Sequence, residues 1–218
     1  MSAPHRAAAR DRILAAAVRR IAREGIDEVR IARIATDAGV SPALIHYHFA
    51  TREALLAQAL DYSYAHAGDA RTAAGELPSA SHAERLDAMV RQCLPASPML
   101  EQDWVLWVEL WLRAVRHHEL REVAEELYGR LHQWFADDIA AGVADGEFAA
   151  VDVDAVADLA LALIDGYGLR ALIGDRAIPL QHAHAAISAA LARQLGCRTH
   201  TPLTEPSLDT AERRKLVF

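Results

Sequence analysis

The chain has 218 residues and a formal net charge of −7 at pH 7, and its two cysteines, Cys93 and Cys197, form no Cys-x-x-Cys pair. These features argue against a disulfide framework and favour a reducing compartment. The longest apolar stretches, such as residues 155–164 with Asp158, are too short and too charged to span a membrane. No apolar leader resembles a secretory signal, so we expect a cytoplasmic protein without membrane contact.

The length allows two domains, and the charge is divided unevenly between them. Residues 1–62 contain nine Arg and seven Asp or Glu, a balance of +2, whereas residues 63–218 have a balance of −9. Binding to a nucleic-acid backbone depends on where arginines lie, so the acidity of the whole chain does not exclude it. We expect a first domain over residues 1–62, a second over 63–197 and a tail over 198–218.

The first predicted helix spans Arg10 to Glu24 and ends at Gly25. A second short helix should end at Gly39, because glycine adopts the left-handed conformation without a Cβ clash. Ser41 is an N-cap candidate and Pro42 a first helical residue, so a third helix begins within three positions. This compact arrangement predicts a helix-turn-helix. Its apolar residues are assigned to a core, among them Ile34, Ala38, Val40, Ile45, Phe49 and Leu55.

Thr51 can cap a fourth helix from Arg52 to about His66. The resulting four-helix unit, over about residues 10–60, resembles the N-terminal domain of TetR-family transcriptional regulators. The resemblance rests on Gly25, Ile34-Ala35, Ala38-Gly39-Val40-Ser41, Tyr47-His48-Phe49, Arg52 and Leu55-Leu56. It implies that residues 42–48 form the recognition helix. By the same resemblance, an operator in double-stranded DNA is contacted by Pro42, Ala43, Leu44, His46 and Tyr47, with Arg52 on a phosphate.

Three residues depart from the family's common pattern. Arg30 replaces a usual Ser or Thr cap, which loses a cap bond and adds a cation that can approach phosphate, as Arg33 also can. His46 replaces a common tyrosine, and Leu44 a frequent small hydroxyl residue, so that Leu44 could read only a thymine methyl group or the groove shape. Tyr47, His46 and the arginines could also be ordinary surface residues.

Beyond residue 66 strand signals are almost absent, which predicts an all-helical second domain and about nine helices in total. Residues 68–81 are expected to form a loop, and Ala96-Ser97-Pro98 a turn. The tail has few apolar residues and should pack weakly. The further helices are expected over about residues 82–94, 100–115, 119–144, 152–173 and 179–195.

Trp104, Trp107 and Trp111 share one helical stripe, at i, i+3 and i+7. Such a stripe can be hydrophobic core or the wall of a ligand cavity. Together with residues 162–175, it resembles the C-terminal domain of the TetR subgroup that includes the choline-responsive betaine-pathway repressor. This resemblance implies a homodimer built on the last two long helices. The glycines Gly166 and Gly168 would each cost about 1 kcal/mol in mid-helix, which close helix approach or a local break beside the pocket would explain.

The aromatic faces and the acidic second domain favour a cationic small-molecule effector, such as a quaternary amine or a polyamine. The expected ligand residues are Trp104, Trp107, Trp111, Glu109, Tyr128 and Asp165, although Glu109 and Asp165 could be surface or interface carboxylates. We expect the effector to shift the helix within residues 75–94 and the helix that runs from Leu100. This shift should change the distance between the two helix-turn-helix units of a dimer and so weaken DNA binding.

No enzyme reading accounts for the chain. Gly39 to Ala43 lacks the second glycine and the preceding strand of a nucleophile elbow, and residues 166–171 follow no strand that would make them a dinucleotide loop. Neighbouring histidines, such as His117 and His118, point about 100° or 200° apart on a helix and cannot share a metal. We therefore expect no catalytic residue, metal or cofactor. A ligand-insensitive regulator or a helical protein-binding adaptor remains an alternative to an effector-controlled repressor.

Overall fold

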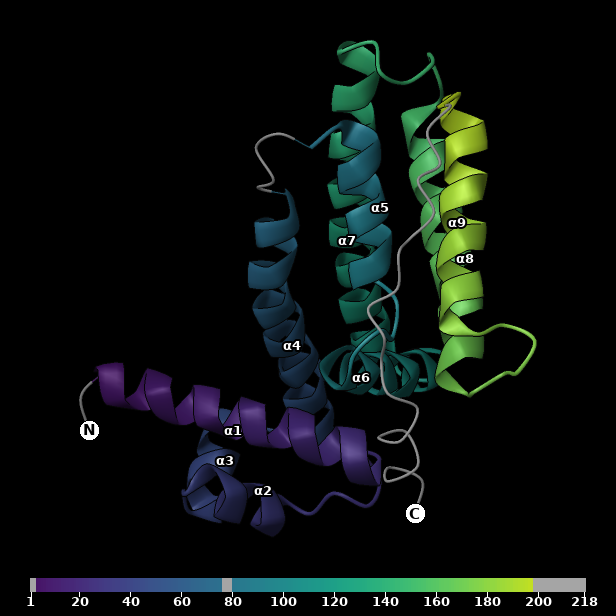
Figure 1. The fold of residues 1–218 in the computed structure, drawn as a ribbon. Helices are drawn as coiled ribbons and strands as arrows, with labels where there is room; N and C mark the ends of the chain where they lie inside the picture. Colours follow the sequence, from purple (N-terminus) through teal and green to yellow (C-terminus); the bar gives the residue numbers. More distant parts are fainter. Residues whose placement is uncertain (1–2, 76–79, 198–218) are drawn as a thin grey trace.

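In the computed structural model, which describes residues 3–75 and 80–197, the chain folds into nine α-helices without a strand (Figure 1). The all-helical prediction is confirmed for this part of the chain, and the predicted tail lies outside it. None of its helices is long and apolar enough to cross a membrane. The helices are α1 (Ala3–Glu24), α2 (Ile31–Ala38), α3 (Pro42–His48), α4 (Arg52–Gly75), α5 (His82–Gln92), α6 (Pro98–Ala114), α7 (His118–Ala144), α8 (Val153–Leu172) and α9 (Leu180–Leu195).

The turn between α2 and α3 forms as the sequence predicts. Gly39 ends α2 in the left-handed conformation, with φ 64° and ψ 41°. Ser41 caps α3 by accepting a hydrogen bond from the Leu44 N–H at 3.3 Å, and Pro42 is the first helical residue. Thr51 caps α4 in the same way through the Ala54 N–H at 3.0 Å. The helix-turn-helix is thus fixed by local backbone chemistry.

Helix α4 differs from the prediction. It runs without a break to Gly75, whereas the sequence pattern placed its end near His66 and a loop over residues 68–81. One glycine inside a helix costs only about 1 kcal/mol, and α4 packs against α1, α5, α6 and α7. The expected domain boundary at residue 62 therefore lies inside a continuous helix, which connects the helix-turn-helix to the rest of the molecule.

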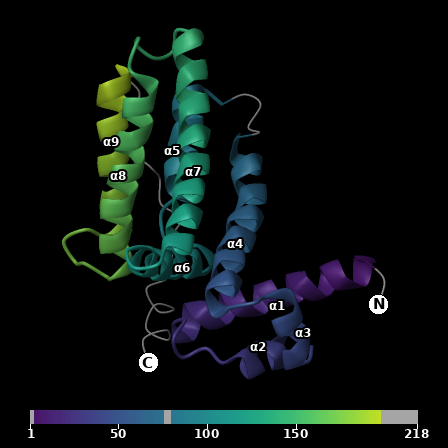
Figure 2. The ribbon, with the colours of Figure 1, turned by 180° about the vertical axis from the view of Figure 1, so that it is seen from behind.

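The other predicted helices agree with the structure to within a few residues, except that α1 begins at Ala3 rather than at Arg10. Helices α5, α7, α8 and α9 stand side by side, while α6 lies across their lower ends and α1 crosses below α4 (Figures 1 and 2). Helix α6 thus lies between the upright helices and the N-terminal unit.

Two hydrophobic cores share α6 and α7. The first core joins the buried residues of α1 to α4 to Leu106 and Leu110 of α6 and to Leu120 and Leu127 of α7. The second core joins α5, α7, α8 and α9 to Trp104 of α6. Because both cores contain side chains of α6, a movement of this helix changes the packing of the N-terminal unit, α1 to α4, as well as the packing of the upright helices.

Candidate functional site

Helix α3 presents a small exposed surface above a buried anchor. Ile45 is buried in the first core, whereas Tyr47 is 68% exposed. His46 and the first residues of the helix, Pro42 and Ala43, are exposed as well. Leu44 is half-buried. The side chains that the sequence assigns to DNA contact therefore lie on the outer side of the helix, which a core residue holds in place.

The three arginines assigned to DNA contact have different surroundings. Arg30 is exposed at the N-cap of α2 and makes no side-chain cap bond, as its residue type predicts. Arg33 is exposed and lies 3.2 Å from a carboxylate oxygen of Glu24. Arg52 donates hydrogen bonds to the carbonyls of Ile26, Asp27 and Val29, the latter two at 3.0 Å. Arg52 thus holds the loop before α2, and its contact with phosphate remains a prediction.

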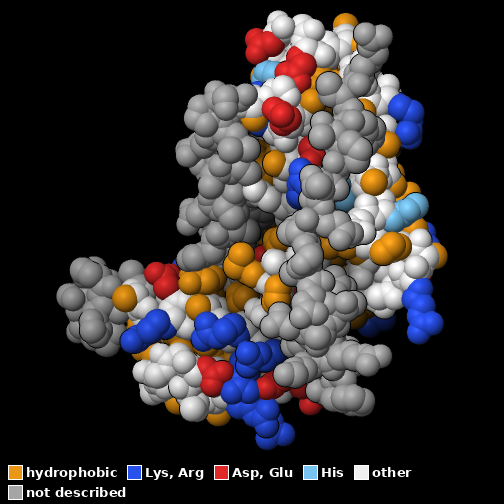
Figure 3. Space-filling view, in the orientation of Figure 1, with side chains coloured by type: hydrophobic (Ala, Val, Ile, Leu, Met, Phe, Trp, Pro, Cys, Tyr) orange, Lys and Arg blue, Asp and Glu red, His pale blue; other side chains and the backbone are white. Residues whose placement is uncertain are grey.

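An ion pair between Arg20 and Asp37 connects α1 to α2. Arg20 on α1 donates to both carboxylate oxygens of Asp37 on α2, at 2.6 and 2.9 Å, and to Glu24 at 2.5 Å. The hydrogen bonds from Arg20 hold the pKa of Asp37 below its ordinary value. Lys and Arg side chains gather on the lower part of the molecule, where α1 to α3 lie (Figure 3). This part of the surface suits a polyanion.

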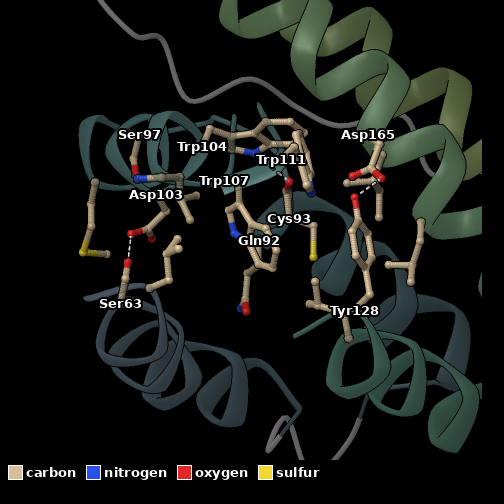
Figure 4. Close-up of a pocket in the computed structure, with 16 residues that line it drawn as sticks. Ser63, Gln92, Cys93, Ser97, Asp103, Trp104, Trp107, Trp111, Tyr128 and Asp165 are labelled. Atoms are coloured by element: carbon tan, nitrogen blue, oxygen red, sulfur yellow. Dashed lines mark hydrogen bonds between the residues drawn. The ribbon is translucent and has the colours of Figure 1, made fainter. Parts of the chain in front are cut away.

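A cavity of about 150 Å³ lies between α4, α5, α6, α7 and α8. Of the residues whose side chains the structure describes, sixteen line it, and five of the six predicted ligand residues are among them (Figure 4). None of these sixteen residues is Lys, Arg or His. The five are Trp104, Trp107, Trp111, Tyr128 and Asp165.

Four aromatic side chains of this lining form a ring cluster. Trp111 stacks on Tyr128 with ring centroids 6.2 Å apart and planes 15° apart. Trp107 lies 5.9 Å from both of these rings, and Trp104 lies edge-on to Trp111 at 5.9 Å. Aromatic faces carry negative quadrupolar charge, so rings gathered around a cavity attract cations.

Asp165 on α8 supplies a charge beside the ring cluster. The Tyr128 hydroxyl donates a hydrogen bond to Asp165 Oδ2 at 2.6 Å. Burial raises the pKa of Asp165, and the bond from Tyr128 opposes part of that rise. Burial also raises the pKa of Tyr128, and the neighbouring carboxyl group adds to it. A cation beside Asp165 would stabilise its ionised form.

Glu109, the sixth predicted ligand residue, is not part of the pocket lining. Its carboxylate pairs with Arg113, and its Oε1 lies 3.2 Å from the position of a Cβ on Gly25. Arg113 in turn donates to Asp27 Oδ2 at 2.8 Å, in the loop after α1. Glu109 is two residues from Trp107, which is about 200° around a helix. The side of α6 opposite the pocket therefore contacts the N-terminal unit.

Several polar pocket residues were not predicted from the sequence. Ser63 on α4 donates a hydrogen bond to Asp103 Oδ1 on α6, and Trp104 Nε1 donates to the Cys93 carbonyl at 3.0 Å. Gln92 of α5 also lines the cavity. Asp103 could have been found, because it lies four residues before Trp107 and so on the same side of α6. Nothing in the sequence around Ser63 marks it.

The glycine at position 168, in the middle of α8, is explained by the close approach of the Trp104 ring. A Cβ on Gly168 would lie 2.2 and 2.3 Å from two ring carbons of Trp104. Of the two explanations that the sequence allowed, close helix approach accounts for Gly168, since α8 continues through it without a break. Around Gly166 no atom lies within 4 Å of such a Cβ, so its presence is not explained within the part of one chain that the structure describes.

Both halves of the chain match models of known protein families. Residues 13–59 match the model for bacterial regulatory proteins of the tetR family, and residues 82–196 match the model for the C-terminal domain of BetI-type transcriptional repressors. The HTH-type transcriptional regulator BetI of Brucella suis biovar 1 is 26% identical over 186 residues, which cover 85% of this chain and 91% of that protein. BetI of Rhizobium meliloti is 29% identical, with coverage of 79% and 82%.

Solved structures agree with these matches. A transcriptional regulator from Saccharomonospora viridis in complex with choline has a TM-score of 0.76 and 34% identity, covering 86% of this chain and 97% of that one. A TetR-family regulator from Rhodococcus sp. has a TM-score of 0.77 and 30% identity, with coverage of 87% and 99%. The family and these relatives are transcriptional regulators and not enzymes. The chain belongs to the TetR family of transcriptional regulators, and its C-terminal domain is that of a BetI-type repressor.

Proposed function

We propose that this regulator is a homodimeric repressor that leaves its operator when a quaternary ammonium ion enters the pocket. The observation that carries the proposal is the ring cluster with Asp165 around a cavity of about 150 Å³. Cation–π attraction and the Asp165 carboxylate favour a cation with an apolar shell, and none of the sixteen described lining residues is basic. The choline bound to the relative from Saccharomonospora viridis supports this ligand class.

The dimer is proposed on mechanical grounds. Two recognition helices must reach successive major grooves about 34 Å apart, which one chain cannot do. We place the interface on α8 and α9. Exposed apolar side chains near the end of α8, Leu169 and Ile173, support this placement. One chain has a mass of 23.8 kDa, and light scattering should give twice that mass.

Helix α6 connects the pocket mechanically to the N-terminal unit, α1 to α4, which contains the helix-turn-helix. One side carries the tryptophans of the ring cluster, and the other carries Leu106 and Leu110 of the first core together with Arg113, which binds Asp27. An effector that shifts α6 therefore moves the loop before α2, and with it the reading helix. The effector weakens DNA binding only if it binds the released arrangement more tightly.

The surface of α3 gives the first prediction. Tyr47→Ala should weaken operator binding by about tenfold or more, because a single base-edge or backbone contact contributes about 1–3 kcal/mol. Arg30→Ala should weaken binding and lower the salt dependence by about one counterion. A gel shift at several salt concentrations, on DNA selected by nuclease protection, measures both effects. Arg91→Ala on α5 also removes one arginine, but away from α1 to α3, and should leave binding unchanged.

Unchanged binding in both the Tyr47 and Arg30 variants would argue against α3 as the reading helix. Failure of the wild-type protein to retard any selected DNA at low salt would instead favour a protein-binding adaptor. Retention of operator binding at saturating ligand would favour a ligand-insensitive regulator.

The effector class is tested by titration of intrinsic tryptophan fluorescence and by calorimetry. Choline and betaine aldehyde should bind and should release the protected DNA, because both are compact quaternary ammonium ions. A polyamine should bind more weakly, since its primary and secondary amines are more strongly hydrated than a quaternary ion. A flat response to all three ligands would rule out the proposed effector class.

The pH dependence of choline binding follows from Asp165. Burial raises the pKa of this carboxyl group above its ordinary value of 3.8. Choline favours the ionised carboxylate, so affinity should be fully present above the raised pKa and should fall as pH drops through it. Calorimetry between neutral pH and about pH 4.5 measures this slope. Asp165→Asn should lower affinity and flatten the profile, whereas an unchanged slope in Asp165→Asn would assign the titration to another group.

A further inference from the structure

Tyr128 joins the two parts of the proposed cation site, the ring cluster and Asp165. Its ring, on α7, stacks on Trp111 with planes 15° apart and lies 5.9 Å from Trp107. Its hydroxyl donates a hydrogen bond to Asp165 Oδ2 on α8 at 2.6 Å. In Figure 4 the side chains of Tyr128 and Asp165 point toward one another at one side of the pocket. One residue therefore supplies both an aromatic face and the bond that holds the carboxylate.

The direction of this hydrogen bond follows from the two groups. Burial raises the pKa of Tyr128, and the neighbouring carboxyl group adds to the rise, so the phenol keeps its proton and donates. Burial also raises the pKa of Asp165, and the bond from Tyr128 opposes that rise, because a hydrogen bond to a carboxylate favours its ionised form. Without the Tyr128 hydroxyl, Asp165 would take up a proton at a higher pH.

The same bond limits where the carboxylate points. An aspartate side chain has two rotatable bonds, and the Tyr128 hydroxyl holds one of its two oxygens in place. The ring that carries the hydroxyl is itself held by its contacts with Trp107 and Trp111 on α6. The carboxylate of Asp165 is thus kept beside the rings, where its charge acts on a cation that lies on their faces.

We propose that Tyr128 is a positioning residue, which keeps the Asp165 carboxylate ionised and beside the ring cluster, and that this pair lets the pocket distinguish a cation from an uncharged molecule of the same shape. The inference rests on the proposed function, because it assumes that a quaternary ammonium ion occupies the ring cluster. It gives the Tyr128 hydroxyl a role that its aromatic face alone does not require.

Other titratable groups lie around this site. Helix α8 packs against α6, α7 and α9. Besides Tyr128 and Asp165, the described lining contains Cys93 and Asp103, and Asp103 lies at the other side of the pocket in Figure 4. Any pH dependence that other groups cause should remain in Asp165→Asn, which is therefore their control. Histidines of α7 and α9 pair with other carboxylates, His132 with Asp158 at 3.4 Å and His184 with Asp87 at 3.0 Å.

The first experiment compares choline with dimethylbutanol on the full-length protein by calorimetry. This alcohol has the shape of choline, but a carbon atom replaces the charged nitrogen. At neutral pH the wild-type protein should bind choline about thirtyfold or more tightly than the alcohol, because only choline carries the charge that the ring faces attract. The preference should fall as the pH drops, since protonation of Asp165 removes the charge of the carboxylate.

Tyr128→Phe keeps the ring and removes the hydroxyl. The fall in choline preference should move to higher pH, so that at about pH 5 the variant prefers choline about tenfold less than the wild type does. Its affinity for dimethylbutanol should change little, because this ligand does not depend on the carboxylate charge. Tyr167→Phe on α8 makes the same change at a tyrosine outside the described lining and is the matched control. Thermal unfolding checks that each variant is folded.

A double-mutant cycle connects the effect to Asp165. In Asp165→Asn the choline preference should be low and nearly independent of pH, and the addition of Tyr128→Phe should lower it no further. Proton release is a second readout. At mildly acidic pH, choline should release more protons from Tyr128→Phe than from the wild type, because Asp165 of the free variant is more often protonated and the bound cation ionises it. Calorimetry in two buffers of different ionisation enthalpy counts these protons.

The outcomes separate the inference from the function on which it rests. An unchanged pH dependence of the choline preference in Tyr128→Phe would overturn the role of the hydroxyl, and so would an equal loss of affinity for both ligands. An equal effect of Tyr128→Phe with and without the Asp165 carboxylate would overturn it as well. In these cases the proposed effector class would stand. If the wild-type protein bound both ligands equally at neutral pH, or neither of them, the proposed effector class would fall together with this inference.

Discussion

Gly168→Ala is expected to lower the free energy of unfolding by about 2 kcal/mol, although alanine is the better helix former. The added Cβ would lie 2.2 Å from a ring carbon of Trp104. That ring is buried and is held by the bond from its Nε1 to the Cys93 carbonyl, so relief of the clash must break this bond or move α8. Urea denaturation at a fixed protein concentration measures the change, because the stability of the proposed dimer would depend on concentration.

Gly129→Ala is the matched control for this substitution. Gly129 also lies inside a helix, but apart from its chain neighbours and the nearby backbone of its own helix, no described atom lies within 4 Å of a Cβ built there. Its replacement should raise the free energy of unfolding by up to about 1 kcal/mol through helix propensity alone. A Gly168→Ala protein as stable as the wild type would mean that the Trp104 indole can shift at little cost.

Trp111→Leu is expected to weaken choline binding by about thirtyfold. Trp111 contacts each of the other three rings of the cluster, and leucine keeps an apolar side chain while removing the π face that would attract the proposed cation. The loss corresponds to about 2 kcal/mol for a partly desolvated cation–π contact. Calorimetry measures it directly, and the DNA affinity without ligand should change much less.

Trp134→Leu separates the loss of a pocket ring from the loss of any tryptophan. Trp134 packs against the second core from α7 and does not line the cavity. This variant should keep wild-type choline affinity while losing some stability. If both tryptophan variants lost choline affinity equally, the effect would reflect weakened folding of the C-terminal domain, and the ring cluster would not be the cation site.

The helix-turn-helix could be predicted in detail because its signals are local. Gly39 in the left-handed conformation, the Ser41 cap and Pro42 at the start of α3 each act within one turn of backbone. The cap that Arg30 does not make was likewise predictable from its side chain. These features depend on no distant residue, so a single sequence reveals them.

The end of α4 was predicted wrongly because Gly75, Pro78 and Ser79 were taken to break the helical pattern over the whole of residues 68–81. The helix instead continues to Gly75 and packs against four other helices. That packing depends on the tertiary fold and leaves no local signal. Glu109 lies outside the pocket lining for a reason that helical geometry already gives, since it is about 200° from Trp107, away from the tryptophan stripe.

The pocket itself could be predicted only in part. The tryptophan stripe is visible because helical periodicity places Trp104, Trp107 and Trp111 together. Ser63 reaches the pocket from a helix that begins in the DNA-reading unit, 40 positions before its partner Asp103. Such convergence depends on how helices pack, and a serine on one helix carries no mark of it.

The first core has a consequence for exchanging parts between regulators of this kind. Leu106, Leu110, Leu120 and Leu127 complete the hydrophobic interior of the DNA-reading unit, although they lie far beyond it in the chain. A fragment cut at residue 62 would expose the apolar surface that these leucines cover. A chimaera with another regulator's C-terminal domain would therefore pack non-matching side chains against the buried face of α1 to α4. In this architecture, joining a new C-terminal domain to this N-terminal unit requires compensating changes on α6 and α7.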